Sequence, residues 1–125
     1  MNAQKHIEYW IAGAQNDILS AQVLLERGRL LHCLFFCHLV IEKAIKAHVV
    51  KATNEVAPRS HSLVFLSEKA GLVFDEDTDD FLGILMKYQL HGRYPDFNPT
   101  LPSVEITRNY LIKTEELLKW ITERL

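Results

Sequence analysis

The sequence has few of the features that mark secreted, membrane-spanning or strongly charged proteins. Its N-terminus, MNAQKHIEYW, lacks a basic leader followed by an apolar block and a small-residue cleavage site, which argues against secretion. The longest apolar run, Leu34 to Val50, is interrupted at Glu42 and is shorter than the roughly 20 apolar residues that span a bilayer. We therefore expect a cytoplasmic protein with no membrane association.

The chain also lacks a large excess of charge of either sign. Its 14 basic and 16 acidic residues give a net charge of −2, and the isoelectric point is near 6.3. Such a chain has no global positive field, so tight nonspecific binding to nucleic acid is not indicated, and we expect no DNA partner. Smaller basic patches are compatible with this balance.

Patterns typical of metal sites are scarce. The two cysteines, Cys33 and Cys37, would lie one above the other on a helix and could form part of a metal site with His32 or His38. We favour two small buried apolar side chains, because no second ligand pair stands at zinc spacing. The acidic run at residues 75–80, DEDTDD, lacks the Gly and terminal Glu of a calcium-binding hand, and acidic side chains favour a helix start. We therefore expect no metal and no cofactor.

The apolar residues that are present recur at helical spacing. In the first segment they stand three or four positions apart, whereas Lys5, Glu8, Asp17 and Glu26 lie elsewhere around the helix. No segment alternates with period two, and no hairpin or repeat signal appears. The expected helices cover residues 3–27, 30–53, 61–70, about 75–90, and the C-terminal segment opened by Pro102 and Ser103.

The predicted fold class is therefore all-α. We expect an up-and-down helical bundle of four long helices plus one short helix, forming a single domain over residues 1–125. Gly28 and Gly71 are the expected helix stops, and Ser60 is the expected N-cap of the short third helix. The short link after Gly28 makes the first two helices antiparallel neighbours.

The second helix carries charge inside its apolar stretch. Glu42 and Lys46 stand four residues apart and can form a helical ion pair, and Lys43 lies between them. If this surface is buried, one of the pair needs a better partner from another segment, because an unpaired buried charge is costly. Arg93 and His61 are the candidates.

Three motifs stand in order along the chain: FFCHLVIEKAIKA at 35–47, PRSHSL at 58–63 and GRYPDF at 92–97. Together they resemble the HEPN domain family, and the resemblance covers nearly the whole chain. The first helix, with Tyr9 and Trp10 followed by Ala14, Asp17 and Ala21, is also similar to that family. One departure is Leu39-Val40-Ile41, where family members commonly carry Gln-Gln-Ala.

The ribonuclease motif of the family, an Arg followed by a His four to six positions later, is not found at its expected place. Arg108-Asn109 begins like the motif, but Lys113, Thr114 and Glu115 stand where the His should be. Lys113 cannot replace an imidazole that titrates near neutrality. RGRLLH at 27–32 has an Arg-to-His spacing of the motif, but it lies at the first helix turn and not late in the domain, where the family motif stands. We therefore assign no catalytic residue.

The resemblance implies a small helical module, usually a homodimer, that binds nucleotide or RNA and partners a minimal nucleotidyltransferase, in a toxin-antitoxin type of pair. One alternative is a metal-independent ribonuclease toxin in which Arg108 works with a histidine from elsewhere in the dimer. The other is a purely structural partner subunit that binds the nucleotidyltransferase through an apolar face. An anion could be held where Arg59 and His61 flank the start of the third helix. Arg93 could hold a phosphate while the ring of Tyr94 beside it stacks on a base. His61 could equally cap and pack, and Arg93 could instead pair with Glu42. The candidate anion or nucleotide cleft consists of Arg59, His61, Arg93, Tyr94, Glu42 and Lys43.

Overall fold

A computed structural model describes residues 1–89 and 100–125 of the chain. The described residues form five α-helices and no strand, which confirms the all-α prediction. Among them, no helix combines the length and the apolar content needed to cross a bilayer. The helices are α1 (Ala3–Glu26), α2 (Leu30–Thr53), α3 (Leu63–Ala70), α4 (Glu76–Met86) and α5 (Val104–Glu123).

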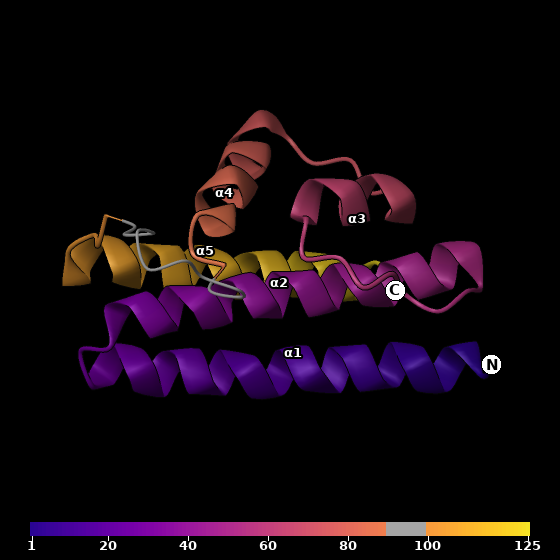
Figure 1. The fold of residues 1–125 in the computed structure, drawn as a ribbon, viewed down its shortest axis with the longest axis horizontal. Helices are drawn as coiled ribbons and strands as arrows, with labels where there is room; N and C mark the ends of the chain where they lie inside the picture. The colour runs from indigo at the N-terminus through magenta and orange to yellow at the C-terminus, as the bar shows by residue number, and fades with distance from the viewer. Residues whose placement is uncertain (90–99) are drawn as a thin grey trace.

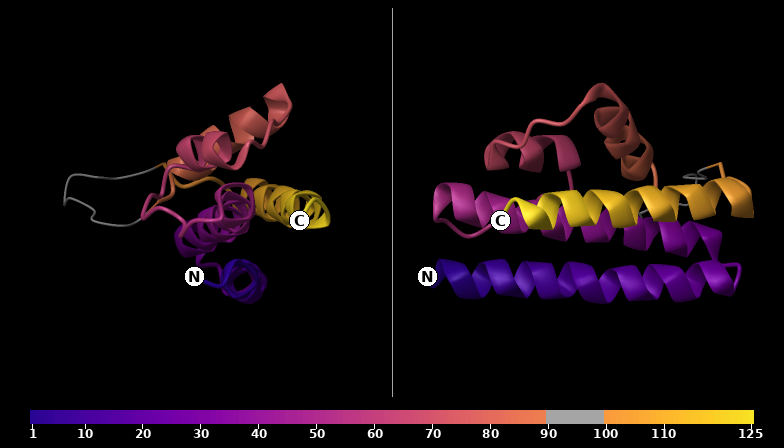
Figure 2. Two further views of the ribbon diagram at one scale, coloured as in Figure 1. Left: turned by 90° about the vertical axis from the view of Figure 1, so that its right-hand side faces the viewer. Right: turned by 180° about the vertical axis from the view of Figure 1, so that it is seen from behind.

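The helix α2 is the centre of the bundle and contacts each of the other four helices. It runs antiparallel to α1, to which a tight turn joins it, and α5 lies beside both (Figure 1). Seen from the end, α3 and α4 form a separate layer on the side of α2 opposite α1 (Figure 2). This central position explains why α2 is the most apolar segment, since most of its residues are buried.

The last helix runs in the same direction as α2. Near the C-terminal ends of the two helices, His48 Nε2 lies 2.7 Å from the backbone oxygen of Ile121. One turn further along both helices, Lys51 Nζ lies 3.4 Å from the backbone oxygen of Arg124. The crossover through α3 and α4 brings the chain back before α5 begins, so α1 and α2 form the up-and-down pair and α5 is parallel to α2.

The helix ends follow local side-chain signals. Asp75 caps α4 by accepting a hydrogen bond from the Thr78 amide at 2.8 Å, as the capping interpretation of the acidic run predicts. Gly71 ends α3 with a φ of 70°, a conformation that glycine adopts without steric cost. α4 ends at Met86, earlier than the predicted residue 90. The amides of Lys87 and Tyr88 donate to oxygens three residues back, as in a 3₁₀ turn, and the Tyr88 side chain is buried.

The predicted start of α3 was two residues too early. Ser62, and not Ser60, is the N-cap, and its Oγ accepts a hydrogen bond from the Phe65 amide at 3.2 Å. The hydroxyl of Ser60 accepts instead from the Ser62 amide at 3.1 Å. Residue 61 therefore precedes the helix, where its side chain can contact α2.

The core contains both cysteines. Cys33 and Cys37 are free and completely buried, as their interpretation as packing residues predicts. A hydrogen bond with Cys33, together with burial, raises the pKa of the Cys37 thiol, whereas the same hydrogen bond lowers the pKa of Cys33. No three potential metal ligands lie close together in residues 1–89 and 100–125.

Candidate functional site

Glu42 is a buried carboxylate with partners from two parts of the chain. It lies on α2 with only 3% of its surface exposed. Its Oε2 lies 3.1 Å from Lys46 Nζ, and its Oε1 lies 2.9 Å from His61 Nδ1. The prediction that a buried Glu42 takes a partner from another segment is confirmed, and His61 is that partner. The other candidate, Arg93, lies outside the described residues.

The backbone of residue 61 is held by a second histidine. His38 Nε2 lies 3.1 Å from the backbone oxygen of His61, and because a carbonyl only accepts, His38 donates this hydrogen bond. His38 Nδ1 lies 3.7 Å from Glu42 Oε1. Both the side chain and the carbonyl of His61 are therefore fixed to α2. This double attachment keeps residue 61 out of α3 and orients the chain as it enters that helix.

Lys46 connects the carboxylate to α1. Its side chain is 7% exposed, and its ammonium bonds Glu42 while it lies 5.1 Å from the centre of the Trp10 ring. A cation over an indole face gains about 0.5 to 2 kcal/mol, and more as water is excluded. Glu42 and Lys46 compensate each other's charge, so loss of either leaves an unpaired charge in the bundle.

Lys43, a predicted member of the cleft, pairs with a residue of α1. Its Nζ lies 2.6 Å from Asp17 Oδ2. Asp17 is 7% exposed, so its placement away from the buried side of the first helix was wrong. Gly13 leaves space for the lysine stem, since a Cβ there would lie 3.1 Å from Lys43 Cδ. Lys43 therefore joins α1 to α2 through its ion pair with Asp17. The sequence signal for this pair was the position of Asp17 one turn from Ala14 and Ala21, which are buried.

The remaining members of the predicted cleft differ in their surroundings. Arg59 is exposed and precedes His61 by two residues. The side chain of His61 is 41% exposed, so it reaches both Glu42 and the surface. Arg93 and Tyr94 lie outside the described residues. The structure thus brings Glu42 and His61 together. Arg59, two residues before His61, has its cationic side chain at the surface.

Arg108 is also exposed, near the start of α5. The histidine that bonds α5, His48, meets it at Ile121, which is about 20 Å further along the helix axis at 1.5 Å per residue. Burial lowers the pKa of His48, and Lys51 and Arg124 act in the same direction, while the hydrogen bond to Ile121 opposes them. His48 therefore contributes to helix packing at a distance from Arg108.

The chain is thus a small all-helical protein in which a buried Glu of the central helix holds the segment before a short third helix. The HEPN domain profile matches residues 7–125, and the chain belongs to the HEPN domain family. A comparison with proteins of curated function finds no match.

Two solved structures are similar to the whole bundle. TT1696 from Thermus thermophilus is 23% identical, with a TM-score of 0.80 and coverage of 100% of both chains. ST0689, described as an archaeal HEPN homologue, is 16% identical, with a TM-score of 0.63 and coverage of 94% of this chain and 96% of that one. At these identities the two structures establish a shared fold.

Proposed function

We propose that this HEPN protein is a noncatalytic module that binds nucleotide or RNA and partners a minimal nucleotidyltransferase, in a toxin-antitoxin type of pair. The observation that carries the binding proposal is the 2.9 Å contact between His61 Nδ1 and Glu42 Oε1. This contact fixes the segment before α3, and Arg59 lies exposed two residues upstream. Family membership supports the choice of ligand and partner.

The chemistry of this segment suits an anion. Arg59 supplies a planar guanidinium that can bind a phosphate through two parallel hydrogen bonds. The first turn of α3 adds the positive end of its helix dipole. Glu42 does not cancel this field, because Lys46 neutralises its buried charge. Arg93 and Tyr94 lie outside the described residues, and we propose them as the phosphate fork and the stacking ring of this cleft.

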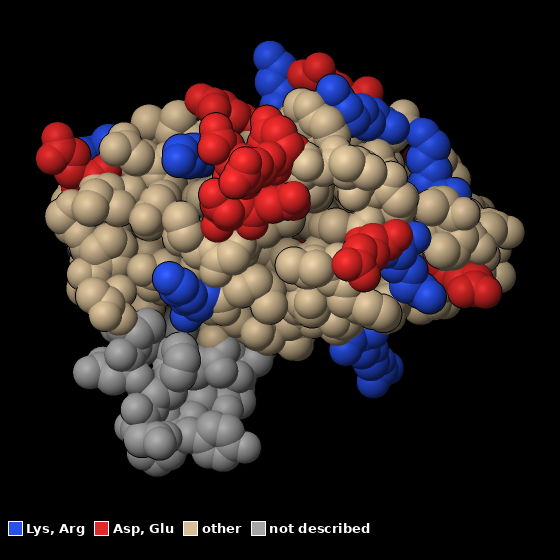
Figure 3. All heavy atoms as spheres, turned by 90° about the horizontal axis from the view of Figure 1, so that it is seen from above, with Lys and Arg blue, Asp and Glu red and all other residues tan. Residues whose placement is uncertain are grey.

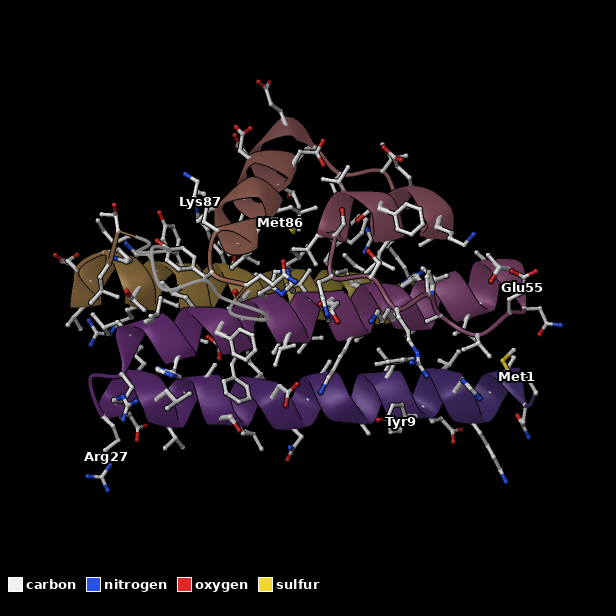
Figure 4. The ribbon with its side chains drawn as sticks, viewed as in Figure 1. Met1, Tyr9, Arg27, Glu55, Met86 and Lys87 are labelled. Carbon is white, nitrogen blue, oxygen red and sulfur yellow. The ribbon has the colours of Figure 1, made fainter. Side chains whose placement is uncertain are left out.

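Calorimetric titration with ATP and with a short single-stranded RNA tests the binding proposal. We expect binding by the natural protein and at least a fivefold weaker affinity for Arg59→Ala, since one charged hydrogen-bond donor contributes about 1.5 kcal/mol. Arg27→Ala is the matched control, because Arg27 points away from the bundle at the turn between α1 and α2 (Figure 4). Absence of heat at millimolar ligand, or equal weakening by both changes, contradicts the proposal.

A homodimer is supported by the outer face of α1. Tyr9, Leu19 and Val23 are 69%, 59% and 55% exposed on the side that faces away from α2. α1 forms one outer layer of the bundle, opposite α3 and α4, in both views of Figure 2. Exposed apolar side chains that share one helix face are a candidate protein interface. We propose that two copies of the chain pair through this face.

Light scattering of the purified chain, at several concentrations, tests the homodimer. We expect twice the chain mass, and a shift to the monomer for Leu19→Lys because the change places a charge in the apolar interface. Val73→Lys is the control, since Val73 is 86% exposed but lies in the loop between α3 and α4. A monomer at all concentrations contradicts this arrangement. Co-purification with a nucleotidyltransferase expressed from the neighbouring reading frame tests the second partner.

A further inference from the structure

A groove of about 620 Å³ lies between the first half of α4 and the last half of α5. The two helices are bridged here by aromatic side chains and not by close backbone packing. Phe74 and Trp120 line the groove with their ring centres 5.4 Å apart, and Phe81 lines it from α4. This surface is formed by other elements than the Glu42 and His61 cluster, which joins α2 to the segment before α3.

Carboxylates surround these rings. Asp75, Asp77 and Asp80 line the groove from the α4 side, and Glu116 lines it from α5. Acidic side chains gather over this part of the molecule when it is seen from the α3 and α4 side (Figure 3). Helix capping accounts for Asp75, but Asp80 is the fifth residue of α4 and lies beyond the first turn, where the helix dipole favours acids.

The aromatic rings beside this groove already hold cations of the chain itself. Lys113 Nζ, which lines the groove, lies 5.8 Å from the centre of the Phe81 ring. The guanidinium carbon of Arg124 lies 3.5 Å from the centre of the Trp120 ring. Of these two cations, only Lys113 lines the groove, and Arg124 lies over Trp120 without lining it. The rings of this region therefore accept an ammonium group inside the groove and a guanidinium group at its edge, as expected for negative aromatic faces.

We propose that this groove binds an arginine-bearing basic segment of a partner protein. A guanidinium fits both parts of the groove, because it stacks on an aromatic ring and donates two parallel hydrogen bonds to a carboxylate. The carboxylates repel phosphate, which separates this surface from the proposed anion cleft near Arg59. The groove proposal does not depend on nucleotide binding.

The test is a titration of the isotope-labelled chain with a hexa-arginine peptide blocked at both ends, followed by NMR near physiological salt. We expect shifts confined to residues that line the groove, including Phe74, Lys113 and Trp120. Two double variants remove the same charge from the same helix. In Asp77→Asn with Asp80→Asn, we expect affinity to fall about tenfold or more, since two charged hydrogen-bond acceptors are lost. In Glu76→Gln with Asp79→Asn, neither residue lines the groove, and we expect a change within about twofold because neither carboxylate faces a guanidinium bound there.

The amide spectrum of each variant reports whether the fold is retained. Equal weakening in the two double variants means that the peptide responds only to net charge, and this result overturns the groove proposal. Shifts outside the groove, no binding, or spermine binding as tightly as the peptide also overturn it, because spermine carries charge without a planar guanidinium. We expect Arg59→Ala to leave the affinity for hexa-arginine unchanged, because Arg59 does not line the groove, so failure here is distinct from failure of the anion cleft.

Discussion

His61 donates from Nδ1 to Glu42 Oε1 over 2.9 Å, and this bond joins residues that are 19 positions apart. Glu42 is 3% exposed and shares its charge with Lys46 on the next turn. The bond therefore fixes the segment before α3 to the buried side of α2. Any binding role of that segment depends on this attachment.

Replacing the carboxylate tests the attachment. In Glu42→Gln, Lys46 stays buried without its counter-charge, and we expect the free energy of unfolding to fall by about 3 kcal/mol or more. Urea unfolding measures the change. Glu123→Gln removes the same charge from an exposed position and is expected to alter stability by less than about 0.5 kcal/mol. Equal stability of Glu42→Gln and the natural protein contradicts the importance of the buried pair.

Two glycines are expected to respond in opposite ways to alanine. Gly83 is inside α4, where a Cβ would meet no atom within 4 Å, so Gly83→Ala should stabilise by about 0.5 to 1 kcal/mol. Gly71 has a φ of 70°, so Gly71→Ala should destabilise by about 1 kcal/mol. Thermal and urea unfolding of both variants check the signs. A stabilising Gly71→Ala contradicts the left-handed end of α3.

The buried imidazole of His48 predicts a loss of stability in weak acid. Burial holds its pKa below the ordinary value of 6.5 in the folded chain. Below pH 6.5 the unfolded chain therefore binds more protons at this position, and the free energy of unfolding falls as the pH decreases toward the folded pKa. We expect this part of the pH dependence to disappear in His48→Gln, whose amide can still donate to the oxygen of Ile121.

Urea unfolding between pH 5 and pH 7 measures this slope. The exposed His32 provides the control His32→Gln, whose slope should match that of the natural protein. If His48→Gln keeps the full slope, burial of this imidazole is not its cause.

Incubation with RNA distinguishes the binding module from a ribonuclease. We expect no cleavage above background by the natural protein, because no His follows Arg108 at the family spacing and His48 meets α5 far from it. Cleavage that is lost in Arg108→Ala would favour the ribonuclease alternative. Cleavage that is equal in both preparations indicates a contaminant.

Local chemistry made much of the helix pattern predictable. α2 covers the predicted residues 30–53, and Gly71 ends α3 as expected, because apolar spacing and a left-handed glycine act over one or two turns. The start of α3 was less predictable because both Ser60 and Ser62 can cap a helix. The contacts of residue 61 with α2 select Ser62.

The sequence by itself determined that Glu42 needed a partner, because a carboxylate in the most apolar helix is costly when unpaired. It could not select between His61 and Arg93, and only the packing of the segment before α3 against α2 decided for His61 among the described residues. The sequence also did not predict the partner of Lys43, because its partner Asp17 was assigned to the wrong side of α1. Spacing along one helix determines which of its side chains share a face. Which residues of another helix lie opposite that face depends on packing and on chain direction. The three-dimensional arrangement therefore determines each charge's partner.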